Sequence, residues 1–430
     1  MTSVRVRPEE RLSVASRLVI EGGRPIHGTV EIGGAKNAAL PIIAACLLTD
    51  EWCIISNVPD IEDIHTMAAA MRALGAEVNF LSRQEVAIRA ANLRTWRTPE
   101  ELARRMRASF LLVGPLLTRF GRAEAPHPGG CALGVRPVNV DVRGFEDMGA
   151  SISYQDGYYV ASATRLQGTQ LYLDYPSHTG TENLLMAACL ARGTTVIKHA
   201  SMEPEVVDLA RFLARMGARI HGAGSPFITV EGVDRLRGAN YRVMPDRLAA
   251  GTYAVAGVIS RGEVTVAHVI PEHLDAVTHK LREAGAYVHE EQDRITVGWR
   301  QPLTAVEIQA IAYPGFPTDL QAAFGALLTQ ARGTSIIHER VFENRFVYAA
   351  ELRKMGAEIK VTGQTARIQG ITPLHGAHVR ATDIRSGAAL VLAALAAEGT
   401  TTIDDTYHID RGYDSLVPTL AALGACIRRE

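Results

Sequence analysis

A Gly-Ala pair recurs six times along this chain of 430 residues, each time directly after a leucine, a methionine or an alanine. The six pairs begin at Gly75, Gly149, Gly217, Gly285, Gly356 and Gly424. Successive pairs lie 74, 68, 68, 71 and 68 residues apart. Self-similarity at a nearly fixed period is the signature of a repeated structural unit, so we expect six copies of one unit.

Each pair ends a segment whose apolar residues recur at helical spacing, for example IEDIHTMAAAMRALGAEV. Glycine commonly follows the last turn of a helix, and a short β-branched strand such as Glu77-Val78 comes next. A second helix lies upstream in each unit and is apolar nearly all round, as in NLLMAACLARGTTVI, which predicts burial in a bundle. The predicted unit is therefore buried helix, strand, outer helix, strand.

Three such units can enclose one core, so six predict two similar domains with a midpoint between residues 232 and 245. The repeats also align the polar residues that begin the buried helices. These are Lys36 with Asn37, Arg107, Glu182 with Asn183, Arg247, Asp319 and Arg385. Free N–H groups and added cations make such helix ends anion sites. If the two domains face each other there, the cleft is predicted to be cationic, with Asp319 as a lone carboxylate.

The overall composition is that of an ordinary globular protein, with 47% hydrophobic and 21% charged residues. A formal net charge of -1 gives no support to nucleic-acid or membrane-surface binding. The five cysteines are irregularly spaced and mostly lie in apolar runs, which favours a reducing compartment. No apolar run is long enough to span a bilayer or to form a signal peptide, so we expect a cytoplasmic protein.

The segment PGGCALGVRP, residues 128–137, surrounds Cys131 with glycines and prolines. This composition predicts a shaped surface loop rather than a helix or a strand. A thiol on such a loop near a permanent cation such as Arg136 can have a lowered pKa and be reactive. Spacing alone favours the alternative, a structural cysteine in an ordinary turn.

Four motifs carry a resemblance that covers the chain from about Arg17 to Cys426. They are GGAKNAALP at 33–41, PGGCALGVRP at 128–137, PGFPTD at 314–319 and VFENRF at 341–346. Together and in this order they closely resemble the UDP-N-acetylglucosamine 1-carboxyvinyltransferase family. The resemblance implies an α/β fold of two inverted α/β prism domains, each with three repeated βαβαββ-like units.

In that family the chain crosses between the domains twice. The resemblance therefore implies an N-terminal domain of residues 35–243 that carries the Cys131 loop. It implies a C-terminal domain of residues 1–34 and 244–430 that carries Asp319, with the active site in the cleft between the domains.

The implied reaction transfers enolpyruvyl from phosphoenolpyruvate to the 3′-hydroxyl of UDP-N-acetylglucosamine and releases phosphate, at the first committed step of peptidoglycan synthesis. It proceeds by addition and then elimination, and the resemblance implies no metal ion, no organic cofactor and no obligate protein partner. The substrates are the expected partners, without nucleic acid or membrane.

The resemblance assigns catalytic roles to Cys131, Asp319, Lys36 and Arg411. Cys131 matches the general acid at the methylene carbon, and Asp319 matches the carboxylate that accepts the hydroxyl proton. Asp319 also stands at a predicted helix start, where a capping role is the alternative. The residues implied to contact phosphoenolpyruvate are Lys36, Asn37, Arg136, Arg345, Arg385 and Arg411. Arg345 has an alternative as an ion-pair partner of Glu343 or Glu339.

For the nucleotide sugar, the resemblance implies contacts from Arg107, Arg136, Pro137, Val138, Asn139, Val140, Tyr175, Ser177, His178, Asp319 and Val341. One segment departs from the family. Where the family usually has Ser-Val-Gly-Ala-Thr, this chain has SHTGT at residues 177–181. An imidazole replaces a β-branched aliphatic side chain at His178, which puts the fine specificity for the nucleotide sugar in doubt.

Two other functions are alternatives to a UDP-N-acetylglucosamine 1-carboxyvinyltransferase. The sister enzyme, 3-phosphoshikimate 1-carboxyvinyltransferase, shares the fold and the donor but does not use a catalytic cysteine on this loop. A non-catalytic UDP-sugar-binding paralogue would have no need of both Cys131 as acid and Asp319 as base.

Overall fold

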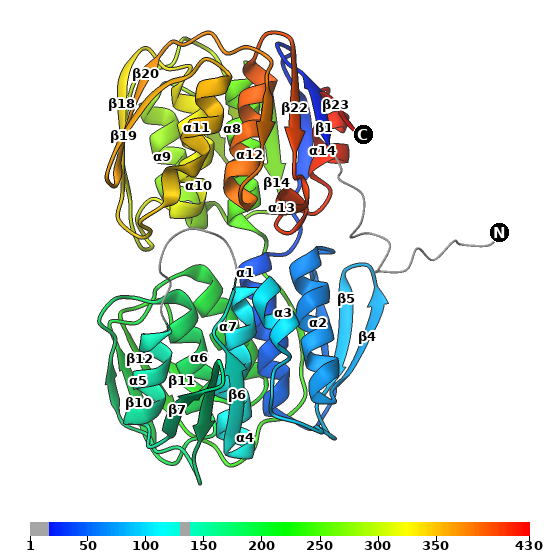
Figure 1. The fold of residues 1–430 in the computed structure, drawn as a ribbon, viewed down its shortest axis with the longest axis vertical. Helices are drawn as coiled ribbons and strands as arrows, with labels where there is room; N and C mark the ends of the chain where they lie inside the picture. Colours follow the sequence, from blue (N-terminus) through cyan, green and yellow to red (C-terminus); the bar gives the residue numbers. More distant parts are fainter. Residues whose placement is uncertain (1–16, 130–137) are drawn as a thin grey trace, which may run out of the picture.

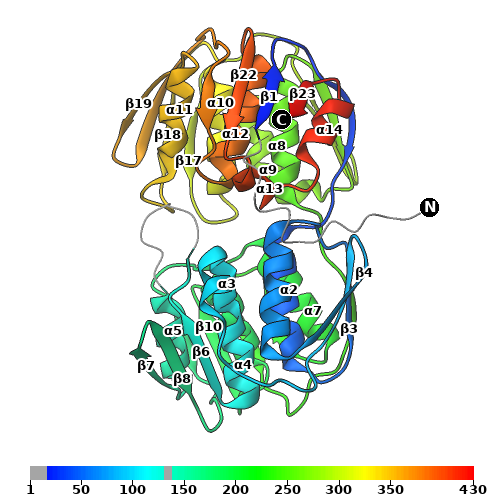
Figure 2. The same ribbon diagram turned by 45° about the vertical axis from the view of Figure 1, so that its right-hand side comes forward.

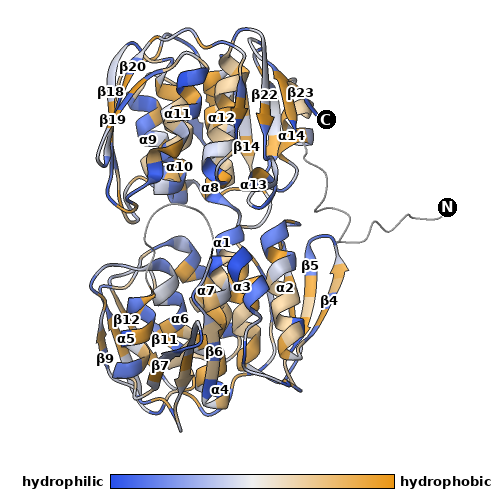
Figure 3. Ribbon diagram, viewed as in Figure 1, coloured by the Kyte–Doolittle hydropathy of each residue, from blue (hydrophilic) through white to orange (hydrophobic). Residues whose placement is uncertain are grey.

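Two hydrophobic cores divide the chain in the computed structural model, which describes residues 17–129 and 138–430. One core is built from residues between 35 and 244, which we call the N-terminal lobe. The other takes residues 18–32 and 248–427, which we call the C-terminal lobe. The lobes lie one above the other in Figure 1, and the apolar residues on their helices can be followed in Figure 3. We propose that the two lobes are the domains 35–243 and 1–34 with 244–430.

Helices that are buried on nearly all sides occupy the centre of each lobe. In the N-terminal lobe they are α1 (Lys36–Ala45), α4 (Val113–Phe120) and α6 (His178–Ala188). In the C-terminal lobe they are α8 (Arg247–Ile259), α10 (Thr318–Leu328) and α12 (Ile384–Ala396). Their alanine- and leucine-rich sequences predicted this burial, because a helix without a polar face cannot lie at a surface.

Six outer helices complete the repeat. They are α2 (Glu62–Leu74), α5 (Asn139–Asp147), α7 (Pro204–Arg215), α9 (Asp275–Glu283), α11 (Tyr348–Lys354) and α14 (Leu416–Ala422). Each ends just before the glycine of a Gly-Ala pair, and all six glycines have φ between 91° and 107°. This left-handed conformation strongly favours glycine, which confirms the predicted helix stops.

Small sheets cover the helices on the outside of each lobe. In the N-terminal lobe the strand orders are β13 (Asn240–Arg242), β3 (Cys53–Ser56), β5 (Glu85–Arg89), β4 (Glu77–Ser82); β6 (Arg122–Pro126), β8 (Tyr158–Ser162), β7 (Ser151–Gln155); and β11 (Arg219–His221), β12 (Phe227–Glu231), β10 (Thr194–Lys198), β9 (Gln170–Tyr172). In the C-terminal lobe they are β15 (Tyr287–Glu290), β16 (Arg294–Gly298), β14 (Glu263–Ala267), β2 (His27–Glu31); β17 (Glu307–Ala310), β18 (Gly333–Glu339), β20 (Thr365–Gly370), β19 (Glu358–Thr362); and β21 (His378–Arg380), β22 (Thr400–Asp404), β1 (Leu18–Glu21), β23 (Cys426–Arg429).

Both N-terminal strands lie in the C-terminal lobe. β2 pairs in parallel with β14, and β1 lies between β22 and β23 with antiparallel pairing on both sides. The strand β13, which ends the N-terminal lobe, returns to pair in parallel with β3 of the first unit. The chain therefore passes between the lobes twice, and the two crossings meet at a bridge between Gly34 and Pro245.

One aspartate caps helices on both sides of these crossings. Asp246 Oδ1 accepts hydrogen bonds from the N–H groups of Leu248 (2.8 Å) and Ala249 (3.0 Å) at the start of α8. Its Oδ2 accepts from the Lys36 N–H at the start of α1, at 3.4 Å. Asp246 thereby satisfies free N–H groups of a helix in each lobe and fixes the position of Lys36 relative to the C-terminal lobe. No helix within residues 17–129 and 138–430 is long and apolar enough to cross a membrane.

Candidate active site

The two lobes meet where the buried helices begin. A cavity of about 490 Å³ lies between them, and residues of both lobes line it, among them Lys36, Asp246 and Tyr413. Figure 2 shows the short helix α13 (Tyr407–Asp410) at the base of the C-terminal lobe, above α2 of the N-terminal lobe. The predicted site residues Lys36, Asp319, Arg345, Arg385 and Arg411 all belong to elements that end at this boundary.

Asp319 lies between two arginines. Its Oδ1 accepts a hydrogen bond from Arg345 Nη2 at 2.7 Å, and its Oδ2 accepts one from Arg385 Nε at 3.0 Å. Both arginine side chains are almost fully buried, at 3% and 5% exposure, while the aspartate side chain is 27% exposed. Arg345 therefore belongs to the Asp319 cluster, and it forms its ion pair with Asp319 rather than with Glu343 or Glu339.

The surroundings keep Asp319 ionised. Burial raises the pKa of its carboxyl group, but the charges of Arg385, Arg345 and Lys36 outweigh burial and hold the pKa well below the ordinary value. The influence of Lys36 shows that the cluster around Asp319 and the start of α1 lie close together. Asp319 is at the second residue of α10, where Pro317 is the capping residue, so the carboxylate does not serve as the helix cap.

Arg385 retains an unused hydrogen-bond donor. Its Nη1 atom is buried and has no partner within the described chain, whereas its Nε atom binds Asp319. Its guanidinium group also lies over the ring of Tyr413, with 5.2 Å between the guanidinium carbon and the ring centroid. A buried donor without a partner is costly, and an anionic group in the adjoining space would supply the missing acceptor.

A second carboxylate joins Lys36 to Arg411. Asp63 Oδ2 lies 3.2 Å from Lys36 Nζ, and its Oδ1 lies 3.0 Å from Arg411 Nε. Arg411 also donates from Nη2 to the backbone oxygen of Arg105, at 2.9 Å. Because Asp63 and Arg105 belong to the N-terminal lobe, Arg411 reaches across from the C-terminal lobe and holds the two lobes together at the site.

Arg247, one of the helix-start residues predicted to form an anion site, is already paired with carboxylates. It pairs with Glu205, with 3.1 Å between Arg247 Nε and Glu205 Oε1, and its Nη2 also pairs with Glu203. Burial raises the pKa of Glu205, but the charge of Arg247 outweighs it, and the pKa lies below the ordinary value. Arg247 is therefore already neutralised by carboxylates of the N-terminal lobe.

Asp319 is also not the lone carboxylate of the boundary, so that prediction was wrong. Asp63, Asp246, Glu203 and Glu205 lie at the same boundary, and the sequence analysis did not identify them as members of the site. The available signal was weak: Asp63 stands in a helical segment, and Glu203 and Glu205 flank the proline that begins α7. Only the packing of distant segments reveals their partners.

His178 replaces the aliphatic residue that the family usually has at this position. It forms an ion pair within its own helix. Its Nε2 lies 3.0 Å from Glu182 Oε1, one turn further along α6. Burial lowers the pKa of His178, but Glu182, Glu203 and Glu205 outweigh burial and raise it to about 10. Burial also raises the pKa of Glu182, so the imidazole and this carboxylate form a mutually neutralising pair at the start of α6.

The predicted nucleotide-binding segments lie against each other. Ser177 caps α6 by accepting a hydrogen bond from the Gly180 N–H at 3.1 Å. A Cβ atom at Gly180 would lie 2.7 Å from Val140 Cγ1, so α5 and α6 pack closely here and a larger residue would make a neighbouring side chain shift. This glycine is part of the departing sequence SHTGT.

The other residues predicted to contact the substrates lie on several separate elements. Tyr175 and Val341 expose 41% and 42% of their surface, and Asn139 begins α5 next to buried Val138. Arg107 begins the 3-10 helix η3 (Arg107–Leu112), and Asn37 follows Lys36 in α1. Burial raises the pKa of Asp141 to about 6, against the lowering effects of a hydrogen bond from Asn183 and of the charge of Arg107. Cys131, Arg136 and Pro137 lie outside the described residues.

Comparison with known proteins identifies relatives over almost the whole chain. A sequence model of the EPSP synthase (3-phosphoshikimate 1-carboxyvinyltransferase) family matches residues 20–420. A UDP-N-acetylglucosamine 1-carboxyvinyltransferase of Halorhodospira halophila is 48% identical over 413 residues, covering 96% of this chain and 99% of the relative. UDP-N-acetylglucosamine 1-carboxyvinyltransferase 2 of Carboxydothermus hydrogenoformans is 49% identical over 415 residues, with the same coverage.

Solved structures agree with this relationship. The enolpyruvyl transferase NikO from Streptomyces tendae superposes with a TM-score of 0.88 at 28% identity, covering 96% of this chain and 99% of NikO. The EPSP synthase of Acinetobacter baumannii superposes with a TM-score of 0.78 at 19% identity, covering 97% of this chain and all of that chain. The second similarity is evidence for the fold alone. The predicted two-domain α/β fold is confirmed.

Proposed function

This chain belongs to the EPSP synthase family and, within it, to the UDP-N-acetylglucosamine 1-carboxyvinyltransferases, and we propose on this basis how its residues act. The protein is a transferase that moves the enolpyruvyl group of phosphoenolpyruvate to the 3′-hydroxyl of UDP-N-acetylglucosamine and releases phosphate. The product commits the sugar to peptidoglycan synthesis. Relatives of this type share 46–49% of their residues with the chain, which favours this acceptor over shikimate 3-phosphate.

The observation that carries the site assignment is the carboxylate of Asp319 held between two buried arginines, beside Lys36. Phosphoenolpyruvate bears a phosphate and a carboxylate, and guanidinium groups bind both kinds of anion with two parallel hydrogen bonds. The unused Nη1 of Arg385 supports a role in binding one of these anions. Lys36 and Arg411 supply further positive charge, and both are held in place by the carboxylate of Asp63.

In the addition step, the sugar's 3′-oxygen forms a bond to C2 of phosphoenolpyruvate, and Asp319 takes the hydroxyl proton. Cys131 gives its thiol proton to C3, which becomes a methyl group. A carboxylate with a strongly lowered pKa is a weak base. We infer that the negative charges of bound phosphoenolpyruvate offset the positive charges of Arg385 and Lys36, which raises the pKa of Asp319 and makes it a better base. In the elimination step, the Cys131 thiolate takes a proton from the methyl group, the C2–O bond to phosphate breaks, and inorganic phosphate leaves with the electron pair of that bond.

The nucleotide is proposed to bind across the starts of α5 and α6, with contacts from Arg107, Arg136, Pro137, Val138, Asn139, Val140, Tyr175, Ser177, His178 and Val341. The start of α6 supports binding of the diphosphate, because free N–H groups at a helix start stabilise an anion, while His178 is already paired with Glu182. We place the reaction in the cytoplasm, which is supported by the free buried thiols of Cys46, Cys53 and Cys189.

The assignment is tested by measuring phosphate release from phosphoenolpyruvate in the presence of UDP-N-acetylglucosamine, another UDP-sugar or shikimate 3-phosphate. We expect release that requires UDP-N-acetylglucosamine and falls by about a hundredfold or more in Cys131→Ser. The half-buried free cysteine in Cys426→Ser is the matched control and is expected to leave the rate unchanged. If no phosphate is released with any of these acceptors, only the non-catalytic sugar-binding alternative is left.

A further inference from the structure

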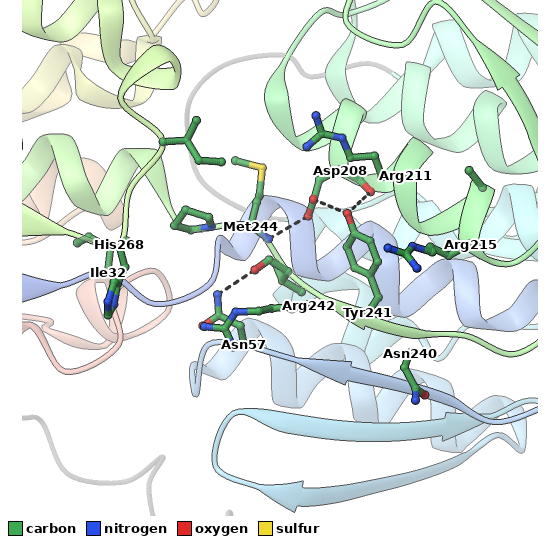
Figure 4. Close-up of a pocket in the computed structure, with 14 residues that line it drawn as sticks. Ile32, Asn57, Asp208, Arg211, Arg215, Asn240, Tyr241, Arg242, Met244 and His268 are labelled. Carbon is green, nitrogen blue, oxygen red and sulfur yellow. Dashed lines mark hydrogen bonds between the residues drawn. The ribbon is translucent and has the colours of Figure 1, made fainter. Parts of the chain in front are cut away.

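A second cavity lies beside the two chain crossings, apart from the site described above. Its volume is about 920 Å³, and residues of both lobes line it. Figure 4 shows Tyr241 and Met244 near its centre, with Ile32 and His268 on the side of the C-terminal lobe. This volume falls within the range of small-molecule pockets, about 300–1,000 Å³. The proposed reaction does not use this cavity.

Three arginines line the cavity. Arg211 and Arg215 stand one turn apart on α7 and therefore share a helix face, and Arg242 ends β13. Within residues 17–129 and 138–430, none of the three side chains has a carboxylate within ion-pair distance. Elsewhere at the boundary, by contrast, Arg247, Arg345 and Arg411 each have a carboxylate partner.

The charge of Arg211 acts on the single carboxylate in the lining, Asp208, but the hydrogen bonds of that carboxylate are made to other groups. Asp208 Oδ1 accepts a hydrogen bond from the hydroxyl of Tyr241 at 2.6 Å, and its Oδ2 accepts one from the Met244 N–H at 3.1 Å. Asp208 is 3% exposed, so its carboxylate holds β13 and the residues after it in place and is not available to a ligand in the cavity. The lining therefore combines three guanidinium groups with one carboxylate that is already engaged, and His268 adds a titratable donor.

The rest of the lining is largely apolar. Its apolar members are Ile32, Ala214, Val243, Met244, Pro245 and Ile270, and Asn57, Asn240 and Tyr241 complete the lining. A ligand that fits both parts of the lining needs an anionic group for the arginines and an apolar or aromatic body for the wall. Among common anions, phosphate matches the fork geometry of guanidinium and accepts several hydrogen bonds at once.

We propose that this cavity, which we call the hinge pocket, is a binding site for an organic phosphate with an apolar or aromatic body. Arg211, Arg215 and Arg242 bind the phosphate, and the apolar lining around Met244 contacts the body. Since both lobes line the hinge pocket, the bound ligand stabilises the folded protein by mass action.

The probe for the test is phenyl phosphate, with phenol as its neutral counterpart. Isothermal titration calorimetry is carried out on the full chain with UDP-N-acetylglucosamine present at saturation. Phenyl phosphate is expected to bind the wild type and to raise its Tm. The variant R211Q/R215Q/R242Q is expected to bind at least tenfold more weakly and to show no such rise in Tm, because it has lost all three guanidinium groups.

The matched control is R192Q/R367Q, which removes exposed arginines outside the hinge pocket and is expected to bind like the wild type. Phosphate release from phosphoenolpyruvate should stay within about twofold of wild type in both variants, which separates the hinge pocket from the active site. If the triple variant does not fold, the three single variants R211Q, R215Q and R242Q are each expected to bind more weakly than wild type. Equal binding by wild type and triple variant, equal binding of phenol, or no binding at millimolar concentration would overturn the proposal.

Discussion

Asp319 shows how one residue can be both a fixed charge and a proton acceptor. The two buried arginines that keep it ionised also bind the kind of anion that the reaction consumes. Its low pKa is therefore a property of the site without substrate. When an anionic donor shares the same arginines, the carboxylate loses part of their stabilisation and becomes a better base.

We predict that Asp319→Asn lowers kcat by about a hundredfold or more, which is the usual contribution of a general base. The stability of Asp319→Asn is a separate prediction. The substitution leaves Arg345 and Arg385 buried without their carboxylate, so the free energy of unfolding falls by about 3 kcal/mol. Urea denaturation measures this loss, and inorganic phosphate is expected to restore part of it by replacing the missing anion. Asp174→Asn, which breaks an exposed ion pair with Arg143, is the control and should change stability by less than about 1 kcal/mol. Unchanged turnover in Asp319→Asn would contradict the proposed base.

The pKa of His178 predicts a specific dependence of stability on pH. A group whose pKa is raised on folding, here from about 6.5 to about 10, stabilises the protein fully below the lower value. That stabilisation is lost as the pH rises through the folded value. We expect His178→Val to lower the free energy of unfolding by about 2 kcal/mol at pH 6 and to have little effect above pH 10. Urea denaturation at pH 6, 8 and 10 tests this, and a pH-independent difference would argue against the ion pair with Glu182.

At the scale of elements, the sequence was most informative where one local rule decides the structure. The six helix stops were predictable because a left-handed residue after a helix strongly favours glycine, as at Gly75 and Gly424. The buried helices were predictable because segments such as α12 have no polar face. The cap of α1 was not predictable, because Asp246 reaches it from 210 positions further along the chain.

Asp246 gives a prediction at this scale, because its carboxylate caps α8 and also touches the start of α1. Asp246→Ala is expected to lower the free energy of unfolding by about 1–2 kcal/mol, as for other N-cap removals. Asp246→Asn keeps a capping oxygen for α8 but loses the acceptor of the Lys36 N–H, so it is expected to lose less stability than Asp246→Ala. Both values come from urea denaturation. Equal losses in the two variants would show that charge, and not capping, is the contribution of Asp246.

At the scale of the whole molecule, the site exists only because two lobes meet. Arg411 reaches Asp63, 348 positions away, and Arg247 reaches Glu205 across the same boundary. The resemblance could name Lys36, Asp319 and Arg411, since family motifs preserve residue types at fixed places. It could not name Asp63 or Glu205, whose roles depend on how distant surfaces pack.

The most direct test of the account is the reaction in D2O with phosphoenolpyruvate and UDP-N-acetylglucosamine, followed by proton NMR of the product. Addition and elimination pass through a methyl group that has taken one proton from solvent, so the enolpyruvyl product is predicted to carry deuterium in its vinyl group. Asp319→Asn should form little product of any kind. A vinyl group free of deuterium, or no enolpyruvyl sugar nucleotide in the wild-type reaction, would contradict the account.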